Sequence, residues 1–563
     1  MIRKLLLLTI LPALLLARSA TAQEFEMVRR QKVTPALQQV LQSAEGPFKV
    51  IVRMRGRHGA SAASQVTGSS WASRLAVRRE EARRSSSELL QFLAGRSTVV
   101  EPKGPAAPRA SVIGDSAVQP RPTELWIANS VCIEATPELV REMASRSDVE
   151  AVYRDVHVQV VPIHELSAAG QPELQARAGG LGLDNPSFKI GLASAATDVP
   201  RSRTAFGGSA DQSGEASAWG ISKLGADRVW DVHGFRGNGV VVGHIDTGVD
   251  ALHPSLAGRV LRFRDFVNGR AEAYDDEGHG THTAGILCSS GGLGVAPGAR
   301  LVVAKALDAR GAGQLSTLLA AMQWMLDPDG NPATDDRPVC VSNSWGVERK
   351  VLKSLGAEET FFWDAVQAWR DGNILPIFAS GNGGANSESV PAGYPTALAV
   401  GATDANGGVS QFSTGGNTTW NGVTYQKPDL CAPGGNILSA MPGGKFQGLS
   451  GSSMACPHVA GLVALLKQAR PSATAQELEN LLRTTTNDLG PAGFDTRFGI
   501  GQVDAMAAVN AALSLPLTVR PSEQPSPAPQ AAPQIESAKK RLRQGLLGLM
   551  IGLAAIFGLS MLG

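Results

Sequence analysis

The sequence predicts an α/β protein: a main domain with a mostly parallel sheet flanked by helices, preceded by a small α+β domain. Its 563 residues are enough for two or three folded units and a sizeable core. Between about 219 and 515, short β-branched apolar runs alternate with helical stretches, which is typical of strands buried on both faces. Before about residue 160, fewer strand-like segments alternate with helices, which indicates a separate small unit.

The first 22 residues are typical of a secretory signal. Two basic residues precede an apolar stretch over 5–17, and the small residues Ala20-Thr21-Ala22 follow. We expect cleavage before Gln23 and therefore export from the cell, into the periplasm or the extracellular medium. The apolar stretch is short for a membrane span, although an uncleaved anchor remains the alternative.

The small α+β domain is expected over 23–160. Its predicted elements are, in order, a strand at 48–54 (FKVIVRM), a helix at 69–96, a strand at 124–135 (ELWIANSVCIEA), a capped helix TPELVREMAS and a strand VEAVYRD. Residues 161–215 are rich in Gly, Ala, Ser and Pro with little periodicity, which indicates a linker or processing region.

The main domain is expected over 216–515. The runs predicted as strands are VVVGHID, LVVAKAL, VCVSNSW, ILPIFAS and ALAVGA, and the clearest helices are STLLAAMQWML and PHVAGLVALLKQA. Strands that alternate with helices in this way form parallel sheets.

The carboxyl end carries a possible membrane anchor. Residues 516–544 form a linker that is first rich in proline and then basic, with Lys539, Lys540, Arg541 and Arg543. Residues 545–563 carry no charge, and at ~1.5 Å per residue they nearly cross a ~30 Å hydrocarbon core. If the main domain is exported, the basic cluster would lie outside the cell, whereas Lys and Arg next to a membrane span usually lie on its cytoplasmic side. The alternative is therefore that residues 545–563 are a processing signal that is removed.

Composition excludes some partners and metal sites. Lys and Arg (52) nearly cancel Asp and Glu (50), so no nucleic-acid partner is expected. The cysteine number is odd and no CxxC spacing occurs, which argues against a zinc site and against a disulfide framework. A bridge among the four cysteines of the second half stays open, because an exported protein meets an oxidising environment. The cysteines are Cys132, Cys288, Cys340, Cys431 and Cys456.

The stretch GHIDTGVD (243–250) places Asp246 at the end of an apolar run. A DTG triplet occurs in aspartic proteases, but these need a second such triplet, and none occurs here. Instead, GHGTHTAG (278–285) and GLSGSSMACPHVAG (448–461) bring a histidine and a serine to glycine-rich helix starts. Asp246, His279 and Ser453 therefore supply the carboxylate, imidazole and hydroxyl of a nucleophilic serine triad.

The glycines and one asparagine complete this pattern. Gly280 and Gly451 allow the backbone and a substrate to approach closely. FASGNGG (378–384) places Asn382 in a loop after a strand, where its amide can donate to a developing oxyanion. The helix that starts at Ser453 aims backbone N–H groups at the same charge. The predicted oxyanion hole is therefore Asn382 and Ser453.

These four motifs, in the order Asp, His, Asn, Ser, resemble those of the subtilisin-like serine proteases (subtilases) over about 219–515. The resemblance implies a serine endopeptidase that hydrolyses peptide bonds through an acyl-enzyme. It also implies that GAGQL (311–315) and NSWG (343–346) are two strands between which an extended peptide substrate adds. The implied substrate-binding residues are Gly311, Gly313, Ser344, Trp345, Gly346 and Gly381. One departure is that the family's Gly-Thr-Ser reads Gly451-Ser452-Ser453.

The small domain resembles the inhibitory propeptide of the same family, chiefly in TPELVREMASRSDVEAVYRD. This resemblance implies a zymogen, in which the domain assists folding and its carboxyl end occupies the active site until it is cut. The protein's own propeptide is then its intramolecular inhibitor.

Several alternatives remain. His279 and His282 could bind a metal, but the Glu and third ligand of a zinc protease are missing. No cofactor is required for the chemistry, whereas DPDGNPATDD (327–336) spaces oxygens as in a calcium loop, and subtilases often bind structural calcium. The opposing functions are a catalytically silent binding protein of this fold, and a peptide ligase that uses the same acyl-enzyme.

Overall fold

The structure is a computed structural model that describes residues 32–44, 46–56, 71–96, 122–159, 219–354, 359–420 and 422–514. The predicted signal, the 161–215 linker and the carboxyl-terminal segments 516–544 and 545–563 lie outside these ranges. No helix within the ranges is both long and apolar enough to cross a membrane.

The main domain contains a seven-stranded sheet in the order β17-β14-β12-β10-β6-β8-β7, and every pair in it is parallel. This confirms the predicted α/β class. The strands are β6 (Val241–Asp246), β7 (Val260–Asp265), β8 (Arg300–Lys305), β10 (Cys340–Asn343), β12 (Leu375–Ala379), β14 (Leu398–Thr403) and β17 (Leu430–Pro433).

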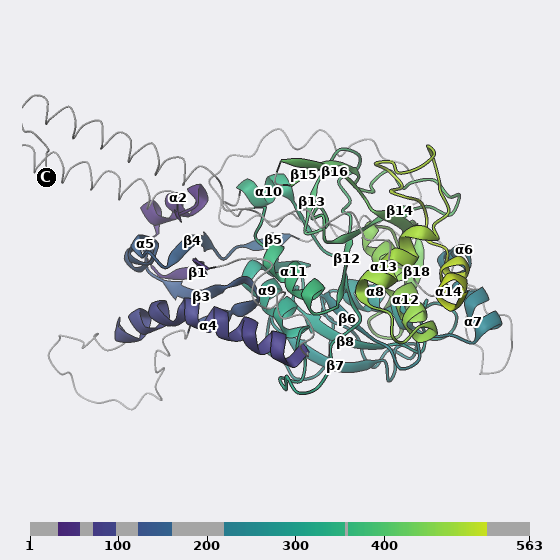
Figure 1. Ribbon diagram of the computed structural model, residues 1–563, viewed down its shortest axis with the longest axis horizontal. Helices are drawn as coiled ribbons and strands as arrows, with labels where there is room; N and C mark the ends of the chain where they lie inside the picture. Colours follow the sequence, from purple (N-terminus) through teal and green to yellow (C-terminus); the bar gives the residue numbers. More distant parts are fainter. Residues whose placement is uncertain are drawn as a thin grey trace, which may run out of the picture.

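Helices cover both faces of this sheet (Figure 1). Side chains alternate along each strand: in β8, Leu301 and Val303 join one apolar cluster, whereas Val302 and Ala304 join the other. The first cluster contains α6 (Trp219–Leu224), α7 (Ala226–His233), α8 (His279–Cys288), α12 (Ser452–Ala469), α13 (Ala475–Thr484) and α14 (Ala505–Ser514). The second contains α9 (Leu315–Trp324), α10 (Arg349–Ser354) and α11 (Trp363–Asp371).

Four short two-stranded ladders surround the main sheet. They are β11 (Val347–Glu348) with β13 (Ser389–Val390), β15 (Gly416–Trp420) with β16 (Val423–Lys427), β18 (Ile437–Met441) with β19 (Lys445–Leu449), and β5 (His157–Gln159) with β9 (Ala312–Gln314). The last of these joins the two parts of the chain, because β5 is the last strand of the small domain and β9 belongs to the main domain.

The small domain has an antiparallel sheet in the order β2-β3-β1-β4. Its elements are α2 (Pro35–Ser43), β1 (Phe48–Met54), α4 (Trp71–Arg96), β2 (Thr123–Leu125), β3 (Ser130–Ala135), α5 (Pro137–Ser145) and β4 (Val149–Arg154). The predicted strand 124–135 is interrupted by a 3-10 turn at Trp126–Ala128, after which Asn129 adopts φ 45°. Helix α5 starts as predicted, with the Thr136 side chain accepting from Leu139 N at 3.3 Å.

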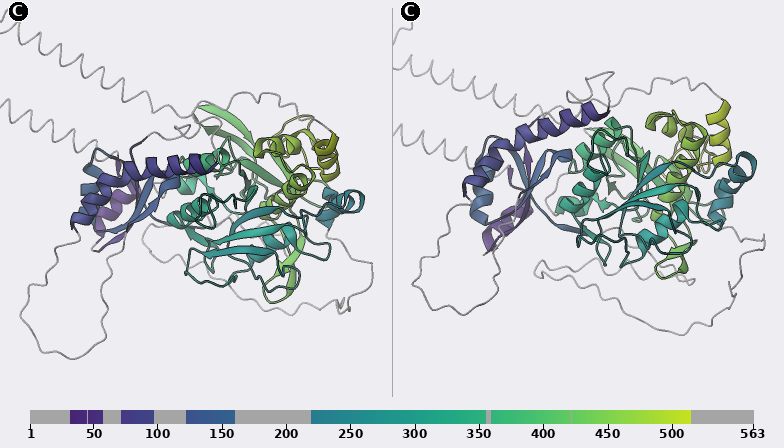
Figure 2. Two further views of the ribbon diagram at one scale, coloured as in Figure 1. Left: turned by 60° about the horizontal axis from the view of Figure 1, so that its bottom comes forward. Right: turned by 90° about the horizontal axis from the view of Figure 1, so that it is seen from below.

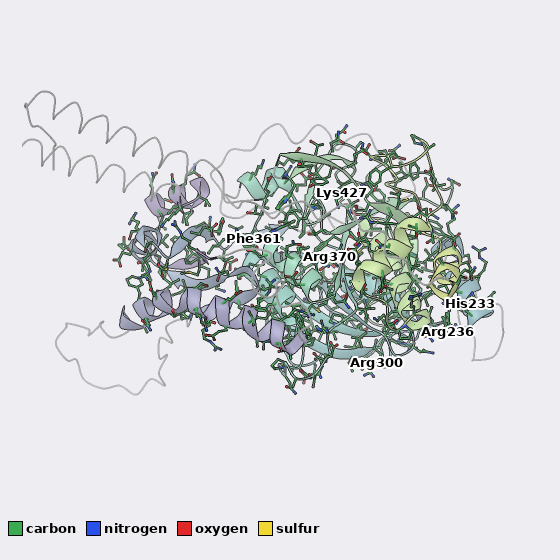
Figure 3. All side chains as sticks on the ribbon, viewed as in Figure 1. His233, Arg236, Arg300, Phe361, Arg370 and Lys427 are labelled. Carbon is green, nitrogen blue, oxygen red and sulfur yellow. The ribbon has the colours of Figure 1, made fainter. Side chains whose placement is uncertain are left out.

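The small domain packs on the α9 and α11 face of the main domain (Figures 1 and 2). Ile51 and Tyr153 of its sheet belong to the same buried cluster as those helices. Phe361 lies at this boundary (Figure 3), where its carbonyl accepts from Arg53 Nη2 at 3.1 Å and its ring meets Tyr153 edge-on. The two domains therefore share one apolar core at their contact.

All five cysteines are free thiols, and the four in the main domain are buried. The disulfide that the sequence left open among these four is not formed in this structure.

Candidate active site

The predicted catalytic carboxylate and imidazole lie in direct contact. Asp246 ends β6 and His279 begins α8, and the His279 Nδ1–H donates to Asp246 Oδ1 at 2.6 Å. Asp246 Oδ1 also accepts from Thr247 N at 2.8 Å, and Oδ2 accepts from the Thr283 hydroxyl at 3.2 Å. Every oxygen of this buried carboxylate is thus hydrogen-bonded, as burial of a charge requires.

Electrostatics keep this pair charged. Burial alone lowers the pKa of His279, but the Asp246 carboxylate and its hydrogen bond outweigh burial and raise that pKa to about 9. Conversely, burial raises the pKa of Asp246, and the neighbouring His279 lowers it further than burial raises it. Asp246 therefore stays ionised and holds the His279 proton on Nδ1, which leaves Nε2 as the basic nitrogen once the ring is neutral.

Ser453 is the second residue of α12, and its hydroxyl donates to the Ser344 carbonyl at 3.2 Å. His279 Nε2 is buried and has no hydrogen-bond partner among the described residues. In this structure the Ser453 hydroxyl therefore makes no hydrogen bond to the His279 imidazole. The hydrogen bond between a catalytic serine and its histidine is often long in substrate-free enzymes, and rotation about the serine Cα–Cβ bond can turn the hydroxyl toward the imidazole.

Asn382 follows β12 and is fixed by the residue before Ser453. Its side-chain Oδ1 accepts from both the backbone N–H and the hydroxyl of Ser452, each at 2.9 Å. The amide nitrogen Nδ2 is left as the donor, and it faces the turn before Ser453, because a Cβ on Gly451 would lie 3.3 Å from it. The Ser452 hydroxyl also accepts from Gly381 N at 3.1 Å, so one side chain orients the whole loop.

The two segments expected to bind substrate differ in the structure. Gly313 lies in β9, whose edge pairs with β5, and Gly311 precedes it with φ 69°. Residues 344–346, expected to continue a strand, form no ladder among the described residues and lie between β10 and β11. The Trp345 ring is buried against Phe362 and Phe378, so it supports the segment from the core side.

Two further residues at the site are structural. His282 Nε2–H donates to the carbonyls of Ile437 and Gln447 at 3.1 and 3.0 Å, and burial lowers the pKa of His282 to about 3. Asp275 Oδ1 accepts from the Thr247 hydroxyl at 2.9 Å and from Gly278 N at 2.8 Å, which joins the end of β6 to the start of α8.

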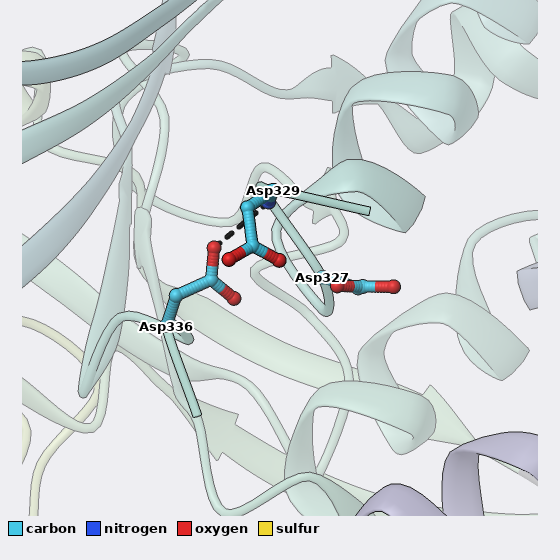
Figure 4. Close-up of side chains that lie close together, drawn as sticks. All are labelled: Asp327, Asp329 and Asp336. Carbon is cyan, nitrogen blue, oxygen red and sulfur yellow. Dashed lines mark hydrogen bonds between the residues drawn. The ribbon is translucent and has the colours of Figure 1, made fainter. Parts of the chain in front are cut away.

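The predicted calcium loop gathers three carboxylates. Asp327, Asp329 and Asp336 each offer an oxygen within 4.8 Å of the others (Figure 4). Asp336 Oδ2 accepts from Asp329 N at 2.8 Å, and the Arg262 guanidinium lies 3.5 Å from Asp329 and 3.6 Å from Asp336. A second guanidinium near the loop comes from the small domain, since Arg79 Nη2 lies 2.6 Å from Asp327 Oδ2.

Sequence reasoning missed the residues that hold the site together. The role of Ser452 depends on Asn382, which is 70 positions away, and that of Thr283 depends on Asp246, which is 37 positions away. The buried His244, whose Nε2 lies 3.1 Å from the Gly280 carbonyl, was also missed. The available signals were a histidine inside an apolar strand and a threonine four residues after His279.

Comparison with known proteins identifies the family. Residues 237–501 match the family model described as "Subtilase family". The chain is 33% identical over 379 residues to M-protease of Shouchella clausii (strain KSM-K16), covering 67% of this chain and 88% of that protein. It is 37% identical over 294 residues to subtilisin Savinase of Lederbergia lenta, covering 52% of this chain and 97% of that protein.

A third relative is much longer. Bacillopeptidase F of Bacillus subtilis (strain 168) is 36% identical over 326 residues, which cover 52% of this chain but 22% of that protein. The similarity to M-protease and subtilisin Savinase, by contrast, extends over nearly their whole lengths. This chain therefore belongs to the subtilase family and is a serine endopeptidase.

Proposed function

We propose that the protein hydrolyses peptide bonds through an acyl-enzyme on Ser453, with His279 as general base and acid and Asp246 as the carboxylate that orients it. The observation that carries this proposal is the 2.6 Å contact between His279 Nδ1 and Asp246 Oδ1, combined with a buried His279 Nε2 that has no partner among the described residues. An imidazole held in this way has one nitrogen available to receive a proton.

The reaction then has two halves. Ser453 Oγ attacks the substrate carbonyl carbon while its proton passes to His279 Nε2, and the carbonyl oxygen becomes an oxyanion facing Asn382 Nδ2 and the Ser453 backbone N–H. The scissile C–N bond breaks as His279 returns the proton to the leaving amine. Water repeats the sequence on the acyl-enzyme, which releases the acid and restores Ser453.

A fluorophosphonate tests this function directly. The reagent should attach to Ser453 in the mature enzyme with loss of fluoride and abolish peptide hydrolysis in step with labelling. Mass spectrometry of the digested protein locates the label. Full activity after stoichiometric labelling, or labelling of another serine that alone accounts for inactivation, would contradict the assignment.

Replacing Asn382 by leucine should lower kcat by roughly 10² to 10³ and leave KM nearly unchanged, because the amide acts on the oxyanion of the transition state. Initial rates with a chromogenic peptide measure both constants. Asn417→Leu, at an exposed asparagine of β15, is the matched control. A change confined to KM would assign Asn382 to substrate binding instead.

We also propose that residues 23–160 are an inhibitory propeptide and that 161–215 carry the maturation cuts. The pairing of β5 with β9 supports this, because β9 contains Gly313 of the predicted substrate groove. A strand of the small domain thus occupies an edge to which a substrate would add.

The Asp327, Asp329 and Asp336 cluster fits calcium, since it offers carboxylate oxygens and since one oxygen each of Asp327 and Asp336 is buried without a hydrogen-bond partner in the described structure. We expect millimolar calcium to raise the melting temperature of the mature enzyme by about 5 °C relative to chelator. The Asp329→Asn, Asp336→Asn double variant should lose this response. An equal rise in both proteins would place the calcium elsewhere.

Export and membrane attachment are proposed from the terminal segments, which lie outside the described residues. The basic and apolar pattern of 1–22 supports export, and the uncharged segment 545–563 supports a tether. We expect the full chain to stay with membranes in carbonate while a chain that ends at Leu515 is released, both carrying Ser453→Ala to prevent self-cleavage. If both are released with the full chain intact by mass, the tether is wrong.

A further inference from the structure

The first half of helix α4 reaches beyond the sheet of the small domain and lies against the main domain (Figures 1 and 2). Arg78 Nη2 lies 2.5 Å from Asp371 Oδ2, and Arg79 Nη2 lies 2.6 Å from Asp327 Oδ2. At the start of the helix, the Arg337 guanidinium lies over the Trp71 ring, with its carbon Cζ 4.4 Å from the ring centroid. This contact is separate from the pairing of β5 with β9.

The two acidic partners are not ordinary surface carboxylates. The Asp327 side chain is 2% exposed and the Asp371 side chain is 29% exposed. Burial raises the pKa of Asp371, and the Arg78 guanidinium opposes that rise. Without the two arginines, both carboxylates would lose a partner in a poorly solvated place, which is costly.

The topology places this contact far from the catalytic groove. Helices α9 and α11 run antiparallel to the strands that they connect. The carboxyl ends of the helices therefore lie beside the amino-terminal ends of the strands. Asp371 is the last residue of α11, and Asp327 follows α9 and precedes β10. Strand β9 comes directly before α9, beside the carboxyl-terminal ends of the strands. The ten residues of α9 span about 15 Å, which separates β9 from the α4 contact.

We propose that Trp71–Arg79 of α4 form a further, charge-based anchor, beside the β5 and β9 pairing and the shared apolar core, which keeps the propeptide on the main domain after the linker has been cut. The proposal rests on the inhibitory role assigned above to residues 23–160. The propeptide then contacts the main domain near both ends of the parallel strands. While one anchor stays in place, the other rebinds at an effective concentration that reaches the millimolar range for short flexible connections.

The expected signature is a salt-dependent release. When the ion pairs of the α4 anchor open into solvent, salt screens their attraction over a Debye length of about 3 Å at 1 M, so they re-form less readily. The β5 and β9 pairing uses backbone hydrogen bonds instead. High salt should therefore weaken the far anchor first and speed departure of the cut propeptide.

The test uses the full chain with Ser453→Ala and a recognition site for a specific protease inserted in 161–215. After cutting, gel filtration over time measures how fast the propeptide leaves. We expect Arg78→Glu with Arg79→Glu to speed release by about tenfold to hundredfold at low salt. The control is Arg83→Glu with Arg84→Glu, which changes the same charge on the exposed side of the same helix and should leave the rate unchanged.

A charge exchange guards against misfolding of the variant. Arg78→Asp should release quickly, and adding Asp371→Arg should restore slow release. Equal release rates for the wild type, the Arg78 and Arg79 variant and the control overturn the anchor while the inhibitory role stands. A wild-type propeptide that leaves at once at low salt overturns both.

An independent observation concerns the buried His244 on β6, two residues before Asp246. Its Nε2 lies 3.1 Å from the Gly280 carbonyl of α8 and 3.4 Å from the Thr283 hydroxyl. A carbonyl cannot donate, so His244 must carry its proton on Nε2. Its Nδ1 is then a buried acceptor without a partner in the described structure, which has a cost in stability.

The proton on Nε2 also removes one possible acceptor from the Thr283 hydroxyl. Since Nε2 has no lone pair left, Thr283 cannot donate to His244. Its proton is shared among the backbone carbonyls of His279 at 3.0 Å and Gly280 at 3.2 Å and the charged Asp246 Oδ2 at 3.2 Å. His244 thus ties the start of α8, which carries His279, to the strand that carries Asp246.

We infer that His244 is a positioning residue for the catalytic pair. His244→Leu should lower kcat about tenfold with KM unchanged, since even a small displacement of the catalytic groups lowers the rate of the chemical step. The melting temperature should change little, because the variant removes the unsatisfied Nδ1 and also the Nε2 bond to the Gly280 carbonyl. His244→Gln, which keeps a donor at similar reach, should recover most of kcat. Wild-type kcat in the leucine variant, or equal losses in both variants, overturns this role.

Discussion

We expect Ser453→Ala to abolish peptidase activity and to leave the proposed propeptide attached to the main domain. The hydroxyl is the only group of the proposed triad that forms a bond to substrate, so neither His279 nor Asn382 has a reaction to assist without it. In subtilisin, a member of this family, loss of the nucleophile costs about 10⁶ in kcat, and we expect the same magnitude here. Chromogenic peptide turnover and mass spectrometry of the purified chain measure the two effects.

The matched control is Ser472→Ala, at an exposed serine beyond the end of α12. It should mature and turn over substrate like the wild type. Equal peptide turnover by wild type and Ser453→Ala would remove Ser453 from the mechanism. A precursor that is cut normally in purified Ser453→Ala would show that maturation depends on another protease.

We expect Asp246→Asn to lower kcat by about 10⁴, because the amide would no longer hold the imidazole in the productive tautomer. It also shifts the pH profile. In the wild type, the proposed base His279 can accept a proton only when neutral, so we expect kcat/KM to fall as pH drops through the His279 pKa, which Asp246 raises to about 9. Without that carboxylate charge, the lowering of the His279 pKa by burial is opposed by the smaller effects of Glu277 and Asp275, so this pKa should fall. The acidic limb should therefore move to lower pH in the variant.

Profiles of kcat/KM between about pH 5 and 11 measure this shift, and residual activity of about one part in 10⁴ is within reach of concentrated enzyme. An acidic limb at the same pH in both proteins would mean that another group titrates. A variant with nearly normal kcat would mean that Asp246 does not orient His279.

The sequence predicted the parts of the site that are local in the chain. Asp246 at a strand end and His279 at a glycine-rich helix start follow from short motifs, and the alternation of strands and helices predicts a parallel sheet. What could not be predicted is contact between distant residues. Nothing near Ser452 in the chain indicates that its hydroxyl holds Asn382, because that depends on how β12 and α12 meet.

The same limit explains the acidic loop. The spacing of Asp327, Asp329 and Asp336 predicted a cluster of oxygens. It could not predict that Arg79, 248 residues earlier in the chain, would pair with one of them. Likewise, 124–135 alternates as one strand, but Asn129 turns the chain left-handed and its amide donates to Met54 O at 3.0 Å.

The free cysteines bear on how the enzyme tolerates its surroundings. Burial raises the pKa of the Cys288 and Cys456 thiols to about 12, although Cys456 lies three residues after Ser453. Almost no thiolate exists at the pH where the imidazole is neutral, and thiolate is the form that alkylating agents and oxidants attack. We therefore expect the buried thiols to react slowly with alkylating agents, and the proposed chemistry on Ser453 does not pass through a thiol.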